Sequence, residues 1–285
     1  NATFLTECSF AVAHDRLVQL ITDVHPYQPY WEPLGEIDLA KKGIESLARL
    51  KEFLPNLDRL DVRGNELTYL SGIPERLREL NVSMNQLTSL TSYAHLVNLE
   101  VLDISNNRVD SIGQLKCLRH LRELSAAGNT ISDLSGIAQT ITLTKLNLKG
   151  NSLKSVSLED CSWPHIENID FSDNGMKSIV GLSNLTTLVT LNLDHNAIGT
   201  LNIDGPLPRL RVIRLSDNKL SELDCSSFTN LRTLYADNNR LGHIRHADKA
   251  RRLENLSLRN QSGRGLRLSV ADIRDVKRMY LSGKY

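Results

Sequence analysis

The stretch Leu57-Asp-Arg-Leu60-Asp-Val62-Arg-Gly-Asn65-Glu-Leu67 decides the fold, because its spacing, L-x-x-L-x-L-x-x-N-x-L, recurs through most of the 285 residues. It returns as Leu99-Glu-Val-Leu102-Asp-Ile104-Ser-Asn-Asn107-Arg-Val109. Nine asparagines hold the same place in successive copies: Asn65, Asn85, Asn107, Asn129, Asn151, Asn174, Asn196, Asn218 and Asn239. They are 20 to 23 residues apart, and a fixed period of this length is typical of a solenoid whose units pack only against their neighbours.

The L-x-L core of each unit predicts a short strand, because alternate residues of a strand point to opposite faces. In the first full copy, Leu60 and Val62 point inward while Asp61 and Arg63 point outward. Stacked strands then make a parallel sheet. The asparagine after each strand can bond backbone groups of the turn that would otherwise be buried and unpaired. The sequence therefore predicts an asparagine ladder beside the sheet.

After each asparagine, apolar residues recur every three positions, as in Val109, Ile112, Leu115 and Leu118. This period suits 3-10 or irregular helical turns better than a full α-helix, and a unit of 20 to 23 residues leaves little room for more. The predicted fold class is an α/β solenoid. It is an arc with a concave parallel β-sheet and a convex side of 3-10 and short helical turns.

The repeat frame divides the chain into three parts. Residues 34–262 carry the repeats, with Lys42 in place of a first asparagine and Gln261 in place of a last one. Residues 1–33 lie outside the frame and predict a capping helix. An aromatic lead-in from His25 to Trp31 follows, which we interpret as a lid over the first coil, with a partner-binding site as the alternative. Residues 263–285 predict a degenerate terminal unit, since the last unit of a solenoid lacks one neighbour.

Composition narrows the class of protein. No uninterrupted run of about 18 apolar residues is present, so we expect no membrane span. The four cysteines, Cys8, Cys117, Cys161 and Cys225, are far apart in the chain. This spacing predicts reduced thiols and an intracellular location, although five tripeptides match the glycosylation acceptor pattern.

The sequence offers no starting point for catalysis. It contains no phosphate-binding glycine loop, dinucleotide fingerprint, zinc-protease motif or calcium loop, and its eight histidines are scattered over different units. We therefore expect a protein that is not an enzyme, that needs no cofactor or metal, and that binds other proteins and not nucleic acid.

The outward-facing residues of the sixth to ninth full units predict a binding surface on the concave sheet. The candidates are Asp170, Asp173, Asp194, His195, Arg214, Asp217, Tyr235 and Asp237. We expect this acidic surface to bind a basic segment. For Asp173 and Asp217 a second reading is equally open, in which the carboxylate only accepts bonds from turn amides. Asp194 and Asp237 lie closer to the strand, which favours an exposed binding role.

A second candidate surface comes from the uneven distribution of charge. The net charge of the chain is +1, but residues 240–285 hold 12 Lys/Arg against 4 Asp/Glu, a local charge of +8. This end of the chain predicts a basic docking surface, with a solvated end cap as the alternative. Its residues are Arg245, Lys249, Arg251, Arg252, Arg259, Arg264 and Arg267.

The 22-residue unit resembles the leucine-rich-repeat subclass typified by the regulatory subunit of protein phosphatase 1, whose members are intracellular protein binders. Two flanking segments, Asp23-Val-His-Pro-Tyr-Gln-Pro-Tyr-Trp-Glu32 before Leu34-Gly-Glu-Ile-Asp-Leu39, and Leu256-Ser-Leu-Arg-Asn-Gln-Ser-Gly-Arg-Gly265, resemble the repeat domain of fungal spindle-pole-body scaffolds. Those scaffolds are similar to centriolin of animal centrosomes and anchor the mitotic-exit or septation-initiation network.

The scaffold resemblance implies a piece of a longer, cytoskeletal protein at the spindle pole body. Its partners would be a pole-body anchor and components of a GTPase-regulator or kinase complex. The phosphatase-regulator resemblance leaves an alternative, a regulatory subunit that positions a protein phosphatase or another catalytic partner. Neither resemblance supplies a short binding motif that transfers residue by residue.

Overall fold

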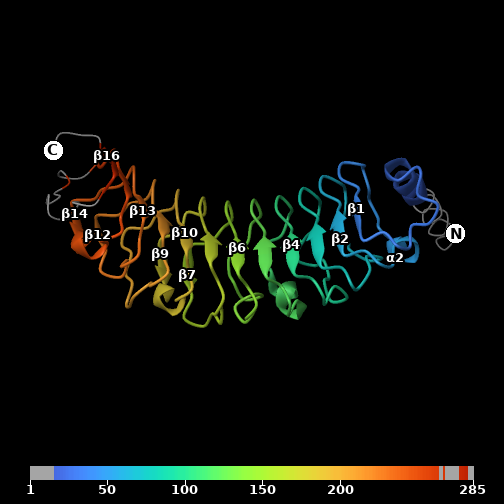
Figure 1. Cartoon of the computed structure of the whole chain (residues 1–285), viewed down its shortest axis with the longest axis horizontal. Coiled ribbons are helices and arrows are strands. Elements are labelled where there is room, and N and C mark those ends of the chain that lie inside the picture. The colour runs from blue at the N-terminus through green and yellow to red at the C-terminus, as the bar shows by residue number, and fades with distance from the viewer. Residues whose placement is uncertain (1–15, 263–265, 267–275, 282–285) are drawn as a thin grey trace. The chain divides into compact units, whose positions relative to one another are not determined.

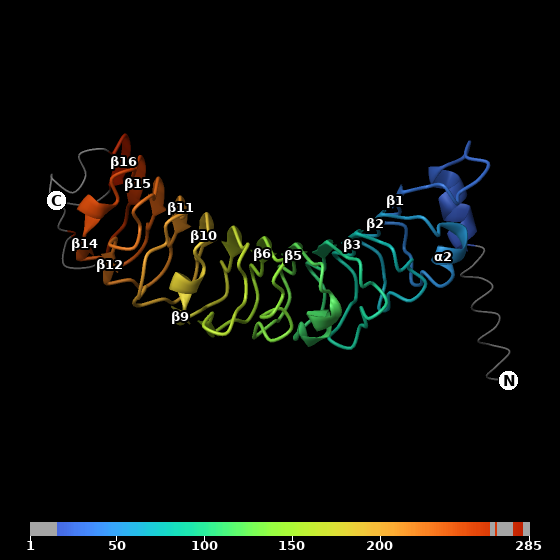
Figure 2. The same cartoon turned by 60° about the horizontal axis from the view of Figure 1, so that its bottom comes forward.

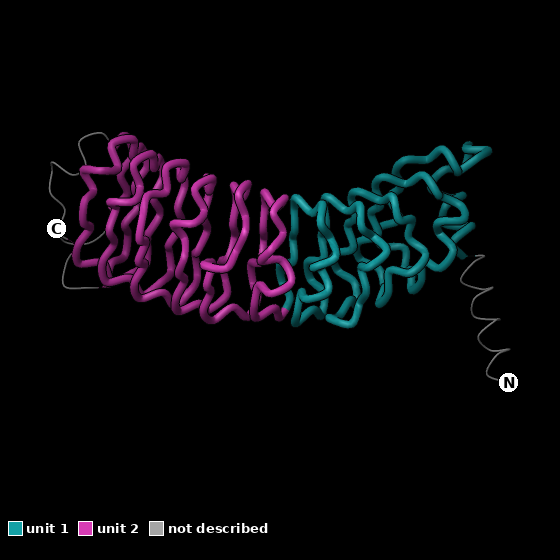
Figure 3. The backbone as a smooth tube through the Cα atoms, turned by 90° about the horizontal axis from the view of Figure 1, so that it is seen from below, with its two compact units in different colours: residues 1–129 teal, residues 130–285 magenta. Residues whose placement is uncertain are grey.

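The computed structural model describes residues 16–262, 266 and 276–281. The chain divides into two compact units, unit 1 at residues 1–129 and unit 2 at residues 130–285 (Figure 3). In both units each turn of the chain adds one short strand to a parallel sheet. The predicted solenoid of parallel strands and short helical turns is thereby confirmed.

Unit 1 begins with a helix at residues 16–24, and its strands then pair in sequence order (Figure 1). The strands are β1 (Glu36–Asp38), β2 (Arg59–Asp61), β3 (Glu79–Asn81), β4 (Val101–Asp103) and β5 (Glu123–Ser125). Their register aligns the buried middle residues, so Leu60 lies beside Leu80 and Leu80 beside Leu102. The α-helical turn α2 (Leu50–Phe53) follows β1, and the 3-10 helix η1 (Gly113–Cys117) follows β4.

Unit 2 contains the parallel sheet β6-β8-β10-β11-β13-β15-β16. The strands are β6 (Lys145–Asn147), β8 (Asn168–Asp170), β10 (Thr190–Asn192), β11 (Val212–Arg214), β13 (Thr233–Tyr235), β15 (Asn255–Leu258) and β16 (Arg278–Leu281). The 3-10 helices η2 (Leu182–Asn184) and η3 (Ala247–Lys249) match the predicted short helical turns.

Two small sheets in unit 2 were not predicted. Strand β7 (Ser155–Ser157) pairs with β9 (Ser178–Val180), and β12 (Glu222–Asp224) pairs with β14 (His243–Arg245). Figure 2 shows β9, β12 and β14 on the opposite side of unit 2 from β10, β11 and β15. A single apolar residue between two outward ones, such as Val156 in Ser155–Ser157, allows an extended segment where the three-residue period suggested only helical turns.

The core is formed by the inward-pointing leucines and isoleucines of successive turns. Leu60, Leu80, Leu102 and Leu124 expose 2% of their surface or less. Burial of one such side chain contributes about 1.5–3 kcal/mol to folding, so the stability of each unit is distributed along the stack.

One residue in each turn, directly before the ladder asparagine, has left-handed backbone geometry. The φ angles lie between 53° and 68° at Lys41, Gly64, Met84, Asn106, Gly128, Gly150, Asp173, His195, Asp217, Asn238 and Asn260. Glycine and asparagine tolerate this region best, which explains why they recur at the position. The turn directs the next side chain back into the stack.

That next side chain forms the asparagine ladder. The amide nitrogen of Asn174 donates to the carbonyl oxygens of Leu148, at 2.9 Å, and Phe171, at 3.1 Å. Its amide oxygen accepts the N–H of Leu153 at 3.1 Å. At the end of the array Gln261 makes equivalent bonds, because its oxygen accepts the N–H of Leu241 at 3.0 Å. A longer amide therefore closes the ladder.

Candidate partner-binding surface

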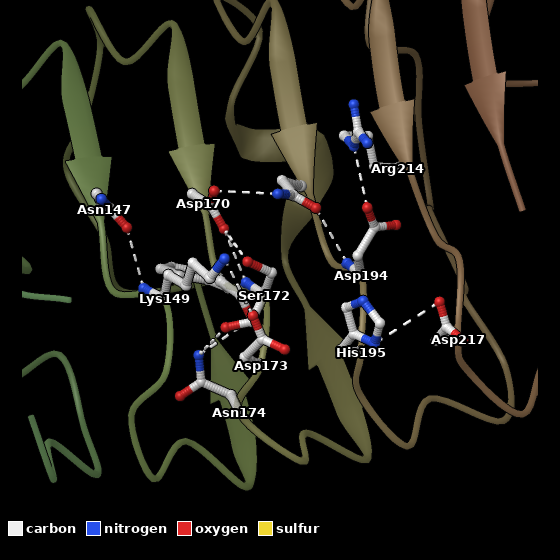
Figure 4. Close-up of polar contacts among 12 residues, drawn as sticks. Asn147, Lys149, Asp170, Ser172, Asp173, Asn174, Asp194, His195, Arg214 and Asp217 are labelled. Atoms are coloured by element: carbon white, nitrogen blue, oxygen red, sulfur yellow. Dashed lines mark hydrogen bonds and ion pairs between the residues drawn. The ribbon is translucent and has the colours of Figure 1, made fainter. Parts of the chain in front are cut away.

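The outward-pointing first and third residues of the strands form an exposed surface in each unit, which we call the sheet face. In unit 2 the predicted site residues Asp170, Arg214 and Tyr235 lie on this face, at the third position of their strands. Asp173, Asp194, His195, Asp217 and Asp237 lie in the turns that follow the strands. Figure 4 shows the neighbouring side chains of β6, β8, β10 and β11 and their turns.

Where the third strand position holds a carboxylate or an amide, that side chain caps its own turn. Asp170 accepts the N–H of Ser172 at 2.9 Å and its hydroxyl at 2.6 Å. In the neighbouring turns, Asn147 accepts the N–H of Lys149 at 3.0 Å and Asn192 accepts the N–H of Asp194 at 3.1 Å (Figure 4). Carboxylates and amides therefore recur at this position because they satisfy backbone donors.

Asp194 does not have the exposed position that the sequence suggested. The residue is only 8% exposed, its Oδ1 accepts the N–H of Ser216 at 2.7 Å, and its Oδ2 accepts Arg214 Nε at 3.0 Å (Figure 4). The expected binding role of this carboxylate is therefore wrong in its premise. A side chain at this place reaches across to the next turn and is covered there.

Asp237 repeats the arrangement of Asp194 further along unit 2. Its Oδ1 accepts the N–H of Arg259 at 2.7 Å, and the Ser257 hydroxyl donates to the same oxygen at 2.7 Å. The Arg259 guanidinium pairs with Oδ2 at 3.1 Å. Arg259 was not predicted to lie at this surface, because the residue lies one turn further along the solenoid than Asp237.

Both arginines also stack on a tyrosine of the following turn. The Arg214 guanidinium carbon lies 5.0 Å from the ring centre of Tyr235, and that of Arg259 lies 5.7 Å from the ring centre of Tyr280. A guanidinium over an aromatic ring at this distance gains a cation–π attraction. Tyr235 is therefore part of a structural brace, in which an aspartate, an arginine and a tyrosine from three neighbouring turns hold one another.

The remaining predicted acids stay accessible. Asp173 pairs with Lys149 at 3.3 Å, and its side chain is 38% exposed. Asp217 pairs with His195 at 3.6 Å, and these side chains are 36% and 57% exposed (Figure 4). The surface between β6 and β11 thus presents Lys149, Asp173, His195 and Asp217 in successive turns, and each of its two carboxylates lies beside a lysine or a histidine.

The predicted basic docking surface also separates into two groups. Arg245 pairs with Glu222 at 2.6 Å, Arg259 pairs with Asp237, and Lys249 lies 4.0 Å from Asp248. Arg251 and Arg252 are exposed. Arg264 and Arg267 lie outside the described residues. Three of the five described residues of this predicted surface are therefore in ion pairs within the chain.

An open hollow of about 630 Å³ lies over the sheet face of unit 1. Strands β1 to β4 line it together with Val24, the last residue of the N-terminal helix, and His25, which follows it. Trp31 packs edge-on against Phe53 at 6.1 Å, whereas Tyr27 and Tyr30 are 96% and 70% exposed. The interpretation of the aromatic lead-in as a lid is therefore wrong for the two tyrosines.

No cluster of three or more histidine, cysteine or acidic side chains that could hold a metal is present among the described residues. Burial raises the pKa of the Cys161 thiol to about 11 and that of Cys225 to about 12, and nearby Asp160 and Asp224 add to the effect. Such thiols remain protonated near neutral pH.

Among the described residues, no helix has both the length and the apolar character needed to cross a membrane.

Models of leucine-rich repeats match three segments of the chain. The model "Leucine Rich repeats (2 copies)" matches residues 75–117, "Leucine Rich repeat" matches 184–201 and "Leucine Rich Repeat" matches 209–231. The fold is also that of solved structures. A leucine-rich-repeat protein of Leptospira interrogans superimposes with a TM-score of 0.68 at 22% identity, over 88% of this chain and 73% of that one. The leucine-rich repeat domain of APL1B gives 0.64 at 20% identity, over 87% and 82%.

Two curated relatives carry more information than the fold. The septation initiation network scaffold protein cdc11 of Schizosaccharomyces pombe is 36% identical over 276 residues, which is 97% of this chain and 26% of that protein. Protein NUD1 of Saccharomyces cerevisiae is 31% identical over 117 residues, 39% of this chain and 14% of that protein. The chain thus spans about a quarter of the first relative's length. These matches support the scaffold interpretation over the regulatory-subunit alternative. The chain is therefore a leucine-rich-repeat protein that is similar, over nearly its whole length, to part of a septation initiation network scaffold.

Proposed function

We propose that this chain is the protein-binding repeat region of an intracellular scaffold that holds septation or mitotic-exit signalling components at the spindle pole body. The observation that carries the proposal is the 36% identity with the septation scaffold over 97% of the chain. The partners would be other proteins, namely a pole-body anchor or members of a GTPase-regulator or kinase complex. No catalytic step, cofactor or nucleic acid is part of the proposal.

The surface formed by Lys149, Asp173, His195 and Asp217 in unit 2 is the docking site we favour for such a partner. Lys149, Asp173, His195 and Asp217 are between 36% and 57% exposed in their side chains, and they occupy successive turns. Surface pairs of this kind contribute little to folding, roughly 0–1 kcal/mol each, so they are available to exchange partners when a protein binds. A ligand with both positive and negative side chains in an extended segment would match them.

The test is capture of partners by the purified, tagged chain from fungal cell extract, followed by identification of the captured proteins. We expect pole-body and septation-network components. The variant Lys149→Glu/His195→Asn should capture less of them, and asparagine is chosen because it tolerates the left-handed backbone of position 195. The control is Lys219→Glu, an exposed residue outside this surface. Capture of phosphatase catalytic subunits in place of pole-body components would contradict the proposal.

A further inference from the structure

One residue per turn, directly before the strand, forms a continuous column along the edge of each sheet. Backbone bonds connect its successive members, as where the N–H of Arg232 donates to the carbonyl of Arg211 at 2.8 Å. In unit 1 the column is Asp58, Arg78, Glu100 and Arg122, and in unit 2 it runs Glu167, Val189, Arg211, Arg232, Glu254 and Lys277. Because neighbouring members are one strand spacing apart, about 4.8 Å, their charges act directly on one another.

In unit 1 this column is neutralised by alternation of charge. Arg78 and Arg122 stand on either side of Glu100 and lie 3.6 and 3.7 Å from its carboxylate. Asp58 is paired as well, with Arg76 at 3.6 Å. The fold therefore accommodates alternating charges at these positions and does not require a surplus of either sign.

In unit 2 the same column loses its alternation. Arg211 and Arg232 are consecutive members of like charge, and the acid that follows them, Glu254, is paired with Lys277 at 3.2 Å. Further arginines lie in the same turns, just before or at the start of the strands. We call the set Arg209, Arg211, Arg232, Arg251, Arg252 and Arg278 the basic edge, and all six are exposed.

The acid next to Arg232 in the column, Glu254, is already paired with Lys277, so the basic edge keeps a surplus of positive charge. Three other arginines of this part of unit 2 are each paired with a carboxylate: Arg214 with Asp194, Arg245 with Glu222 and Arg259 with Asp237. None of the six basic-edge side chains has an ion pair or side-chain hydrogen bond within residues 16–262 and 276–281. Like charges in neighbouring turns repel one another, and packing of these exposed side chains does not offset the repulsion. The repulsion therefore lowers the stability of the chain, and an anionic ligand would restore it.

We propose that the basic edge binds an acidic, extended segment of a protein partner. The inference rests on the proposed scaffold function only in that the ligand is a protein. The half-buried Val189 lies in the same column and the half-buried Val212 on the sheet face beside it, so a peptide can place carboxylates on the arginines and an apolar side chain next to them. A nucleic acid is disfavoured because its continuous phosphates would meet Glu167 further along the same column.

The direct test is fluorescence anisotropy of the whole chain with a labelled peptide of alternating glutamate and glycine. We expect Arg211→Glu/Arg232→Glu to weaken binding by about tenfold or more, since two ion pairs become two repulsions. The matched control is Lys219→Glu/Arg240→Glu, which makes the same charge change in the same two turns, behind the ladder asparagines, and should bind as the wild type does. The milder variant Arg211→Gln/Arg232→Gln, with thermal denaturation of each protein, separates a loss of binding from a loss of fold.

Three outcomes would overturn the proposal. Equal weakening by the control pair would show that only net charge matters. Tighter binding of a single-stranded oligonucleotide than of the acidic peptide, lost on the same two substitutions, would identify a nucleic-acid site. Undiminished capture of the partners by Arg211→Glu/Arg232→Glu from cell extract would rule out the basic edge as a binding site and leave the proposed scaffold function intact.

Discussion

Arg259 contacts Asp237 with both its backbone and its side chain: the N–H donates to Oδ1 at 2.7 Å, and Nε donates to Oδ2 at 3.1 Å. The Asp237 side chain is only 14% exposed as a result. A carboxylate so placed joins one turn of the solenoid to the next. Its charge is neutralised by Arg259 within the fold and is not available to a partner.

Replacement of Asp237 should therefore reduce stability. Asp237→Ala leaves the N–H of Arg259 and the Ser257 hydroxyl without their acceptor, and we expect the free energy of unfolding to fall by about 1–3 kcal/mol. Urea denaturation measures this change. The control is Asp173→Asn, which tolerates the left-handed backbone of position 173 and removes only the exposed pair with Lys149, roughly 0–1 kcal/mol. Equal effects of the two substitutions would show that Asp237 is not a brace.

The asparagine ladder should be needed in the middle of the array more than at its start. The amide oxygen of Asn151 accepts the N–H of Ile131 at 2.9 Å, and its nitrogen donates to the Leu148 carbonyl at 3.0 Å. Asn151→Ala strips these buried backbone groups of their partners, so we expect a loss on the order of 1–3 kcal/mol in urea denaturation. Lys42→Ala, at the position where the first turn lacks the asparagine, should change the midpoint far less.

The fold was predictable from the sequence because one repeated spacing dictates it. Leu60, Asn65 and their equivalents define strand, turn and ladder in every repeat, and neighbouring repeats form the same contacts. The candidate site was less predictable. Whether Asp194 is exposed depends on the N–H of Ser216, one turn away, and the sequence register does not give the reach of the side chain. Arg211 and Arg232 were missed because charges were counted along the sequence, although the position directly before each strand, compared between turns, carried the signal.

Met84 occupies a backbone position that favours glycine. Its φ is 55°, and its side chain is 53% exposed. The left-handed region costs a residue with a Cβ atom about 1–2 kcal/mol, whereas glycine enters it freely but loses more chain entropy on folding. We therefore expect Met84→Gly to raise the free energy of unfolding by up to about 1 kcal/mol. The converse control, Gly64→Met at the same place in the preceding turn, where φ is 68°, should lower it.

Tyr93 is buried with an unpaired hydroxyl, and removal of that hydroxyl should stabilise unit 1. The residue is 3% exposed, and its hydroxyl is the buried side-chain oxygen without a hydrogen-bond partner among the described residues. An unsatisfied buried polar group costs about 1–3 kcal/mol, so Tyr93→Phe should raise the free energy of unfolding by about 1 kcal/mol at neutral pH.

Burial, with a smaller contribution from Cys117, raises the pKa of the Tyr93 hydroxyl well above its usual range. The folded state therefore favours the neutral phenol. The contribution of the neutral phenol to the free energy of unfolding is fully present below the pKa of the unfolded state, about 10. It is lost as the pH rises toward the pKa of the folded state. Urea denaturation between neutral and alkaline pH should show the wild type weakening more steeply than Tyr93→Phe, while Tyr280→Phe, at a residue 48% exposed, should follow the wild type. Parallel pH profiles for wild type and Tyr93→Phe would contradict the burial of this hydroxyl.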